Sequence, residues 1–255
     1  MGGFLFLAVL AVAGAQASEP ACDRDHPDSL PLPDPNGGLG PEEPGDPGCP
    51  DGMARVEDFC IDRFEASLIE TNGLRRSPYH NPGSRPARAV SVRGAVPQGY
   101  ITQPQASSAC AAAGKRLCTD VEWLRACRGS ESRRYPYGTA RDPKRCNDSR
   151  AVHPAIELFG DRRNPFLYIQ NACLNQLRGG LARAGEYEGC ATPEGVFDLM
   201  GNLHEWSADP AGTFRGGYYV DTRINGEGCL YRTVAHGVRH FDYSTGFRCC
   251  ANARE

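Results

Sequence analysis

Cysteine is the residue type with the richest chemistry in this chain. Twelve cysteines occur, and the C-x-x-C pairs of zinc knuckles are absent. An even count in an exported chain is typical of disulfide bonds. Cys49 and Cys60 are candidates for one bond, and the partner of Cys22 stays open. Cys249 and Cys250 are adjacent, and neighbours on a strand point to opposite faces, so we expect two different bonds rather than one strained vicinal pair.

Three histidines are the other candidates for chemistry. His236 and His240 are four residues apart, and His204 is a candidate third ligand of a metal site. Gly237 and the short loop around it disfavour a helical face, so we expect hydrogen-bonded or surface histidines. The sequence shows neither the His-x3-His-x-Glu pattern that would support an iron site nor a recognisable Ser-His-Asp arrangement.

The first 17 residues resemble a secretory signal peptide. An apolar run ends in the small-x-small pattern Ala15-Gln16-Ala17. The run is too short to span a bilayer, and no later stretch is apolar enough to do so. We therefore expect a signal peptide at 1–17 and a secreted or periplasmic protein with no integral membrane segment in the mature chain.

The composition separates a leader from a folded domain. Residues 18–48 are rich in Pro, Gly, Asp and Glu and predict a disordered linker, and the domain is expected at 49–255. Twenty-eight Lys and Arg against 31 Asp and Glu leave a net charge of −3. This charge balance does not indicate a positively charged surface that would bind nucleic acid. The oligomeric state is left open.

Two helices are predicted before residue 130 to position these groups. The alanine-rich run 104–113 has Pro104 in its first turn and Gly114 after its end. Thr119 and Glu122 form a capping box for a second helix, which Gly129 ends. The buried face of this second helix is expected to contain three residues: Trp123, Leu124 and Cys127.

Short strands are predicted at both ends of the domain. They comprise 53–56, 59–64, 203–206, 214–220 and 245–250, while 68–99 reads as loop. The expected fold class is therefore irregular α+β, held together by disulfides.

Four segments in a fixed order carry a family resemblance. They are GKRLCTDVEW (114–123), YPYG (135–138), GVFDLMGNLHEW (195–206), and RGG (215–217) with GFRC (246–249). Together they resemble the formylglycine-generating enzyme (sulfatase-modifying factor) family, whose pattern is GKRLPTEAEWE, FPWG, GxxDMxGNxWEW, RGGS and GFRC. The resemblance spans roughly residues 50 to 252 and implies a C-type-lectin-like variant with low regular secondary structure, stapled by disulfides and, in the enzymes, stabilised by calcium.

The resemblance also implies an activity that this sequence does not fully support. The enzymes oxidise a substrate cysteine to formylglycine with oxygen and a copper ion held by two cysteines, the first a few residues after RGGS. Here Tyr218 occupies the position of the serine, and no cysteine occurs between Arg215 and Cys229. Cys229 is the only candidate copper ligand, and one thiolate is a poor Cu(I) site. We favour a structural role for it, with Cys190 as a candidate partner.

Two structural cysteines also follow from the resemblance. Cys110 and Cys127 lie where the family places such residues, and the family pairs the first with the cysteine of GFRC, here Cys249.

Calcium is the second metal that the resemblance implies. Asp198 and Glu205 would supply side-chain oxygens, and Gly201 and Leu203 backbone carbonyls, a hard-oxygen set suited to Ca²⁺. The alternative is that Asp198 merely closes a turn. The other calcium site of the family is matched in part by two neighbouring residues, Asn147 and the weaker candidate Asp148.

Two main functions follow. The first is a non-catalytic binding or scaffold domain with a protein or peptide partner, which the missing copper cysteines favour. The alternative is an active oxidase of the family, acting through Cys229 or as a related non-haem metal oxidase. Calcium-dependent sugar recognition is weaker because the Glu-Pro-Asn and Trp-Asn-Asp motifs are absent.

Overall fold

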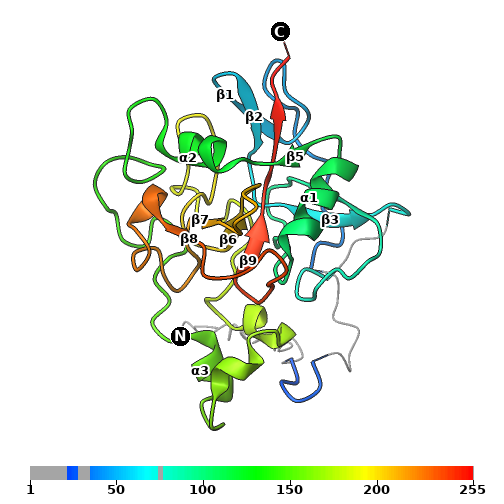
Figure 1. Ribbon diagram of the computed structural model, residues 1–255, viewed down its shortest axis with the longest axis vertical. Helices are drawn as coiled ribbons and strands as arrows, with labels where there is room; N and C mark the ends of the chain where they lie inside the picture. Colours follow the sequence, from blue (N-terminus) through cyan, green and yellow to red (C-terminus); the bar gives the residue numbers. More distant parts are fainter. Residues whose placement is uncertain (1–21, 28–34, 74–76, 255) are drawn as a thin grey trace, which may run out of the picture.

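The computed structural model describes residues 22–27, 35–73 and 77–254, and its helices and strands are short. The predicted signal peptide at 1–17 lies outside the described residues. Figure 1 shows three small sheets surrounded by loops and helices. One sheet has the order β1 (Met53–Val56), β2 (Phe59–Asp62), β10 (Cys249–Asn252), β5 (Arg116–Leu117). A second pairs β3 (Ser67–Glu70) with β4 (Ala87–Val90), and the third has the order β8 (Arg232–Thr233), β7 (Phe214–Arg215), β6 (His204–Trp206), β9 (Thr245–Phe247).

The C-terminal segment joins two of these sheets. Strand β9 pairs in parallel with β6, and β10 lies antiparallel between β2 and β5. Only Arg248 separates β9 from β10. In Figure 1 this red segment runs through the middle of the molecule. The expected single strand 245–250 is therefore two strands, and the break places the Arg248 side chain at the centre of the fold, where it is fully buried.

The two predicted helices are confirmed with their caps. Helix α1 (Gln103–Ala112) begins after Thr102, and α2 (Asp120–Arg128) begins after Thr119, whose side chain accepts a hydrogen bond from the Glu122 backbone N–H. Gly129 ends α2 with a φ of +60°, which suits glycine. The buried face of α2 contains Trp123, Ala126 and Cys127, so the expectation for Leu124 is wrong.

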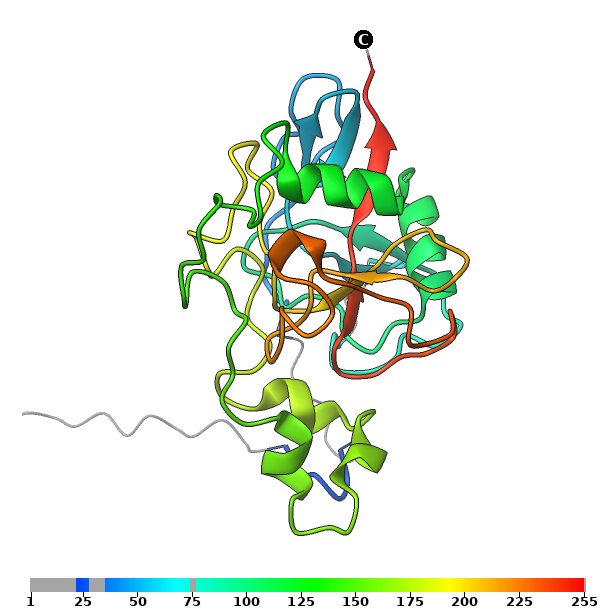
Figure 2. The same cartoon turned by 60° about the vertical axis from the view of Figure 1, so that its left-hand side comes forward.

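The remaining helical segments were not predicted. They are α3 (Pro154–Phe159) and the 3-10 turns η1 (Pro165–Tyr168), η2 (Ala172–Gln176) and η3 (Gly228–Leu230). Figure 2 shows α3 and its neighbours as a lobe below the sheets, next to the blue N-terminal segment. A disulfide between Cys22 and Cys173 ties that segment to η2.

Two predictions about strands are corrected. Residues 68–99 are not all loop, because β3 and β4 pair over four positions. A long connection separates the two strands, so local periodicity does not reveal that they pair. The expected strand 214–220 ends at Arg215. Gly216 and Gly217 have φ values of +82° and +73°, and this left-handed backbone turns the chain away from β7.

All twelve cysteines form six disulfides. The Cys49–Cys60 and Cys110–Cys249 bonds are confirmed, and Cys250 pairs separately with Cys118. The suggested Cys190–Cys229 pair is wrong, because Cys229 bonds to Cys127 and Cys190 bonds to Cys146. Helix α2 packs against η3, and this contact brings Cys127 to Cys229.

The expected linker at 18–48 extends too far. Asn36 is buried and exchanges two hydrogen bonds with the backbone of Val96. The carboxylate of Glu42 accepts hydrogen bonds from Lys115 at 3.0 Å and from the Ser91 backbone at 2.9 Å. Composition misses such a segment because a few long-range polar contacts, together with the packing of Leu39 against the Val90 and Val92 side chains, hold it to the domain. Among the described residues, no helix is long and apolar enough to cross a membrane.

Candidate functional site

Glu205, a predicted calcium ligand, lies in a buried ion pair. The Arg248 guanidinium donates to both Glu205 oxygens at 2.7 Å, and the Trp123 indole donates to Oε2 at 2.7 Å. Arg248 also donates to the carbonyl of Phe197 at 2.8 Å and to that of Asp62 at 3.0 Å. Glu205 therefore serves as the charge partner of Arg248, which joins β6 to the C-terminal segment.

Two further buried carboxylates surround this pair. Asp198 accepts a hydrogen bond from the Gly185 backbone N–H at 2.7 Å, and burial raises the pKa of Asp198 to about 7. Glu65 accepts from the Leu203 backbone N–H at 3.0 Å and from the Asn202 amide. Burial also raises the pKa of Glu65, and the negative charges of Asp198 and Glu205 raise it further. Glu65 lies outside the four sequence motifs and was not predicted as a site residue.

Calcium at Asp198, Gly201, Leu203 and Glu205 stays a prediction, and the contacts of Glu205 count against it. Glu205 would have to give up, or share with a second cation, oxygens that already bind a guanidinium. Gly201 packs against the backbone carbonyl of Asn147, and the Asn202 N–H donates to that carbonyl at 2.8 Å. The structure thus brings the two predicted calcium segments together through direct protein contacts.

Asp148 differs, since its carboxylate is only partly satisfied. Oδ2 accepts hydrogen bonds from Arg141 and from Thr222, whereas Oδ1 is buried with no hydrogen-bond partner among the described residues. The Asn147 amide donates to the Gly180 carbonyl and to Asn202. Calcium at Asn147 and Asp148 stays a prediction, with Asp148 Oδ1 as the oxygen available for it.

A cavity of about 230 Å³ opens beside the turn that follows Arg215-Gly-Gly. The two glycines lead into a turn in which Tyr218 and Asp221 exchange backbone hydrogen bonds, and a Cβ on Gly217 would lie 2.3 Å from the Asp221 carbonyl. This turn meets β6, β7 and the segment 242–244. Twelve residues line the cavity: His204, Phe214, Tyr218, Asp221, Ile224, Asn225, Tyr231, Thr233, Ala235, His236, Asp242 and Ser244.

A continuous hydrogen-bond chain runs along this cavity. The Asn225 amide approaches the Tyr231 hydroxyl at 3.0 Å, and this hydroxyl lies 3.3 Å from His204 Nε2. On the other side of the ring, His204 Nδ1 lies 3.2 Å from Ser244 Oγ, which donates to Asp242 at 2.7 Å. One assignment satisfies every group: His204 is neutral, donates from Nδ1 to Ser244 and accepts at Nε2 from Tyr231.

Electrostatics agree with a neutral His204. Burial lowers the pKa of His204 to about 4. Burial acts to raise the pKa of Asp242, but hydrogen bonds from His240 and Ser244 outweigh it and lower that pKa below its usual value. Asp242 is therefore charged at neutral pH. Because Asp242 contacts Ser244 and not His204, the order of groups differs from that of a hydrolase triad, in which the acid orients the histidine.

The other two histidines are hydrogen-bonded or exposed, as predicted. His240 Nε2 lies 2.9 Å from Asp242, and the exposed His236 stacks on His240 with ring centroids 3.9 Å apart. Over the part of the chain that the structure describes, no three His, Cys, Asp or Glu side chains are grouped so as to hold a metal ion.

Cys229, the candidate copper ligand, is not a free thiolate in the structure. Its side chain is fully buried and bonded to Cys127. Copper ligation by Cys229 would require that this disulfide be reduced.

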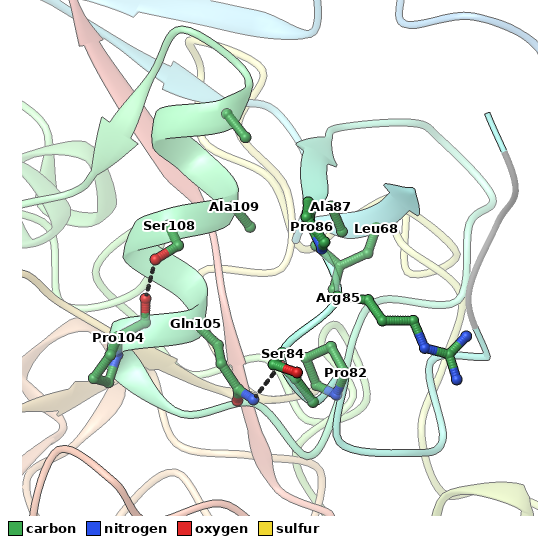
Figure 3. Close-up of a pocket in the computed structure, with 12 residues that line it drawn as sticks. Leu68, Pro82, Ser84, Arg85, Pro86, Ala87, Pro104, Gln105, Ser108 and Ala109 are labelled. Carbon is green, nitrogen blue, oxygen red and sulfur yellow. Dashed lines mark hydrogen bonds between the residues drawn. The ribbon is translucent and has the colours of Figure 1, made fainter. Parts of the chain in front are cut away.

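A second hollow of about 360 Å³ lies between α1 and the 82–87 segment (Figure 3). Its walls are largely apolar, including Leu68, Pro86 and Ala109, and Arg85 is the charged residue among the described ones that line it. Figure 3 shows the Arg85 side chain directed away from α1. The described residues that line this hollow include no acid, base or nucleophile other than serine hydroxyls, so we place the candidate site at the His204 cavity.

Comparisons with known proteins agree with the four motifs. A model of the family described as "Sulfatase-modifying factor enzyme 1-like domain" matches residues 36–254. The Mus musculus protein "Inactive C-alpha-formylglycine-generating enzyme 2" is 27% identical over 182 residues, 66% of this chain and 53% of that protein. "Hercynine oxygenase" of Mycolicibacterium smegmatis is 28% identical over 145 residues, 54% of this chain and 28% of that protein. The chain thus spans about half or less of the length of these two relatives. The structure of PvdO from Pseudomonas aeruginosa aligns with a TM-score of 0.49 at 14% identity, over 84% of this chain and 90% of that one.

Proposed function

The chain belongs to the sulfatase-modifying factor enzyme 1-like domain family, and on that premise we propose that it is an exported, non-catalytic binding domain with a protein or peptide partner. The Cys127–Cys229 disulfide carries this proposal. It removes the one cysteine near the Arg215-Gly-Gly turn that was a candidate copper ligand, and the other cysteines are also in disulfides. A Cu(I) site of soft thiolates therefore has no ligands in the oxidised protein.

Two further observations support the proposal. The mouse relative is named as inactive, although it is matched over only about half of its length. Six disulfides support export, because such bonds persist in oxidising compartments.

Copper binding and oxygen consumption test the proposal. The oxidised protein would be titrated with Cu(I) against a chromophoric chelator, and oxygen uptake would be followed with a cysteine-containing peptide. We expect no stoichiometric copper and no loss of peptide thiol above that caused by free copper. Sustained, copper-dependent oxidation of the peptide by the native protein would overturn the proposal.

A matched variant shows whether the assay detects a thiolate at this place. Cys127→Ser leaves Cys229 without its partner, so this variant should retain more Cu(I) than the native protein. With one thiolate it should still not oxidise the peptide. Peptide oxidation by Cys127→Ser, absent in the native protein, would indicate an enzyme controlled by this disulfide and would contradict a purely binding role.

A further inference from the structure

The charge lining the His204 cavity is negative. Asp221 and Asp242 contribute carboxylates, and none of the twelve described residues that line the cavity is Lys or Arg. The histidines add little positive charge. Burial lowers the pKa of His204 to about 4 and also lowers that of His236, where the neighbouring His240 adds to the effect. At neutral pH the cavity therefore attracts cations.

The walls between these carboxylates are aromatic. His204 packs against Phe214, Tyr218 and Tyr231, with ring centroids 5.3, 4.7 and 5.5 Å from its own. Tyr218 is half-buried, and the exposed side chain of Ile224 lies at the rim. Aromatic faces attract organic cations through the ring quadrupole, most strongly where water is excluded.

Hydrogen bonding restricts which cation fits. Asp242 Oδ1 already accepts from the Ser244 backbone and hydroxyl, and Oδ2 is paired with His240. The Asp221 carboxylate accepts from the backbone N–H groups of Arg223 and Ile224. A primary ammonium needs three acceptors of its own, which these groups do not offer. A quaternary ammonium needs none and is held by charge and ring contacts alone.

From this geometry we propose that the cavity binds a quaternary ammonium group, with Tyr218 and Asp221 as its principal contacts. The inference rests on the proposed binding function and names the ligand class of that site. A bare metal ion fits less well, because the described residues contain no cluster of three ligating side chains. The cavity volume of about 230 Å³ suits one such group rather than a whole drug-sized ligand.

Choline and its uncharged carbon isostere, 3,3-dimethyl-1-butanol, form a matched pair of probes. Each would be titrated into the full oxidised protein and followed by ligand-observed NMR. We expect saturable binding of choline and at least about 5-fold weaker binding of the isostere, because only choline gains the cation–ring and carboxylate attraction. Equal binding of the two, or no binding of choline, would refute the proposal.

Two variants assign the contacts. Tyr218→Leu should weaken choline binding about 2- to 30-fold, the range expected for a cation–ring contact, whereas Tyr218→Phe keeps the ring and should bind almost normally. Asp221→Asn should weaken choline and leave the isostere unchanged. If Tyr218→Leu and Tyr218→Phe behave alike, the ring is not a contact and the proposal fails.

A third probe separates the sources of the group. A short peptide with trimethyllysine should bind more tightly than choline if the ligand is part of a protein partner, and less tightly if it is a free small molecule; either result supports the quaternary ammonium. Failure of all cationic probes, with copper and oxygen results as expected above, would remove the ligand class and leave the non-catalytic function standing.

Discussion

Replacing Arg248 tests the buried charge cluster at the centre of the fold. Its guanidinium is fully buried, donates to both Glu205 oxygens at 2.7 Å and reaches the backbone carbonyls of Asp62 and Phe197. Arg248→Met keeps a long side chain but removes five donors. Three buried carboxylates, those of Glu205, Glu65 and Asp198, would then lose the guanidinium that they share.

The expected cost is large. Removing one partner of a buried ion pair costs about 3–5 kcal/mol, because the other charge stays buried without compensation. In a chain of this size, each kcal/mol lowers Tm by about 2–4 °C, so the Tm of Arg248→Met should fall by about 6–20 °C. Adding Glu205→Gln should recover part of this loss, since the amide oxygen can still accept from the Trp123 indole.

Thermal unfolding of the oxidised proteins, followed by circular dichroism, measures these differences. Arg133→Met is the matched control. Arg133 is also buried, but its partner Glu194 lies 3.4 Å away, and the Glu194 side chain is 30% exposed. That variant should lose no more than about 1 kcal/mol. If Arg248→Met costs no more than Arg133→Met, or if the double variant is less stable than the single one, the reasoning about the cluster is wrong.

Three other predictions concern pH, disulfides and calcium. Burial lowers the pKa of His153 below its unfolded value of 6.5, so its stabilisation is complete above pH 6.5 and is lost as pH falls below it. Urea unfolding at pH 7 and pH 5 should therefore show a smaller loss for His153→Gln than for the native protein, and equal losses would count against this. Replacing Cys127 and Cys229 together by serine should lower the free energy of unfolding by about 2–5 kcal/mol. In the native protein, non-reducing peptide mapping should recover Cys127 and Cys229 in one disulfide-linked fragment, and a free thiol at either position would exclude the bond. After chelation, millimolar Ca²⁺ should raise Tm, and Asp148→Asn should abolish the rise; an unchanged melting curve for the native protein would show that no calcium binds.

Local signals could be read from the sequence because their physics is local. Thr119 and Glu122 are three residues apart, and their capping box needs only the first turn of α2. Cys49 precedes β1 and Cys60 lies in β2 of the same hairpin, with a sequence separation of 11. The order of the four motifs likewise indicated the family, and the family-model match over residues 36–254 confirms it.

Long-range contacts could not be read in this way. Cys127 and Cys229 are 102 residues apart, and their pairing depends on how α2 packs against η3. Glu65 lies outside the four motifs, and only the folded chain brings it to Asn202, 137 residues further on. The family resemblance therefore pointed to Glu205 as a calcium ligand, and only the folded chain shows that its carboxylate is paired with Arg248.

The departures from the family pattern meet at one place in the fold. His204 stands for a tryptophan of that pattern, Tyr218 stands for a serine, and Asp221 lies in the stretch where the first copper cysteine would be expected. The three residues line the same cavity, and the rings of His204 and Tyr218 lie 4.7 Å apart. A site that had merely lost its cysteines would be expected to leave unpaired polar groups, because the remaining residues would still suit a metal. Here the chain from Asn225 to Asp242 satisfies His204 on both sides of its ring. On the proposed binding function, the three substitutions are therefore parts of one site rather than separate losses.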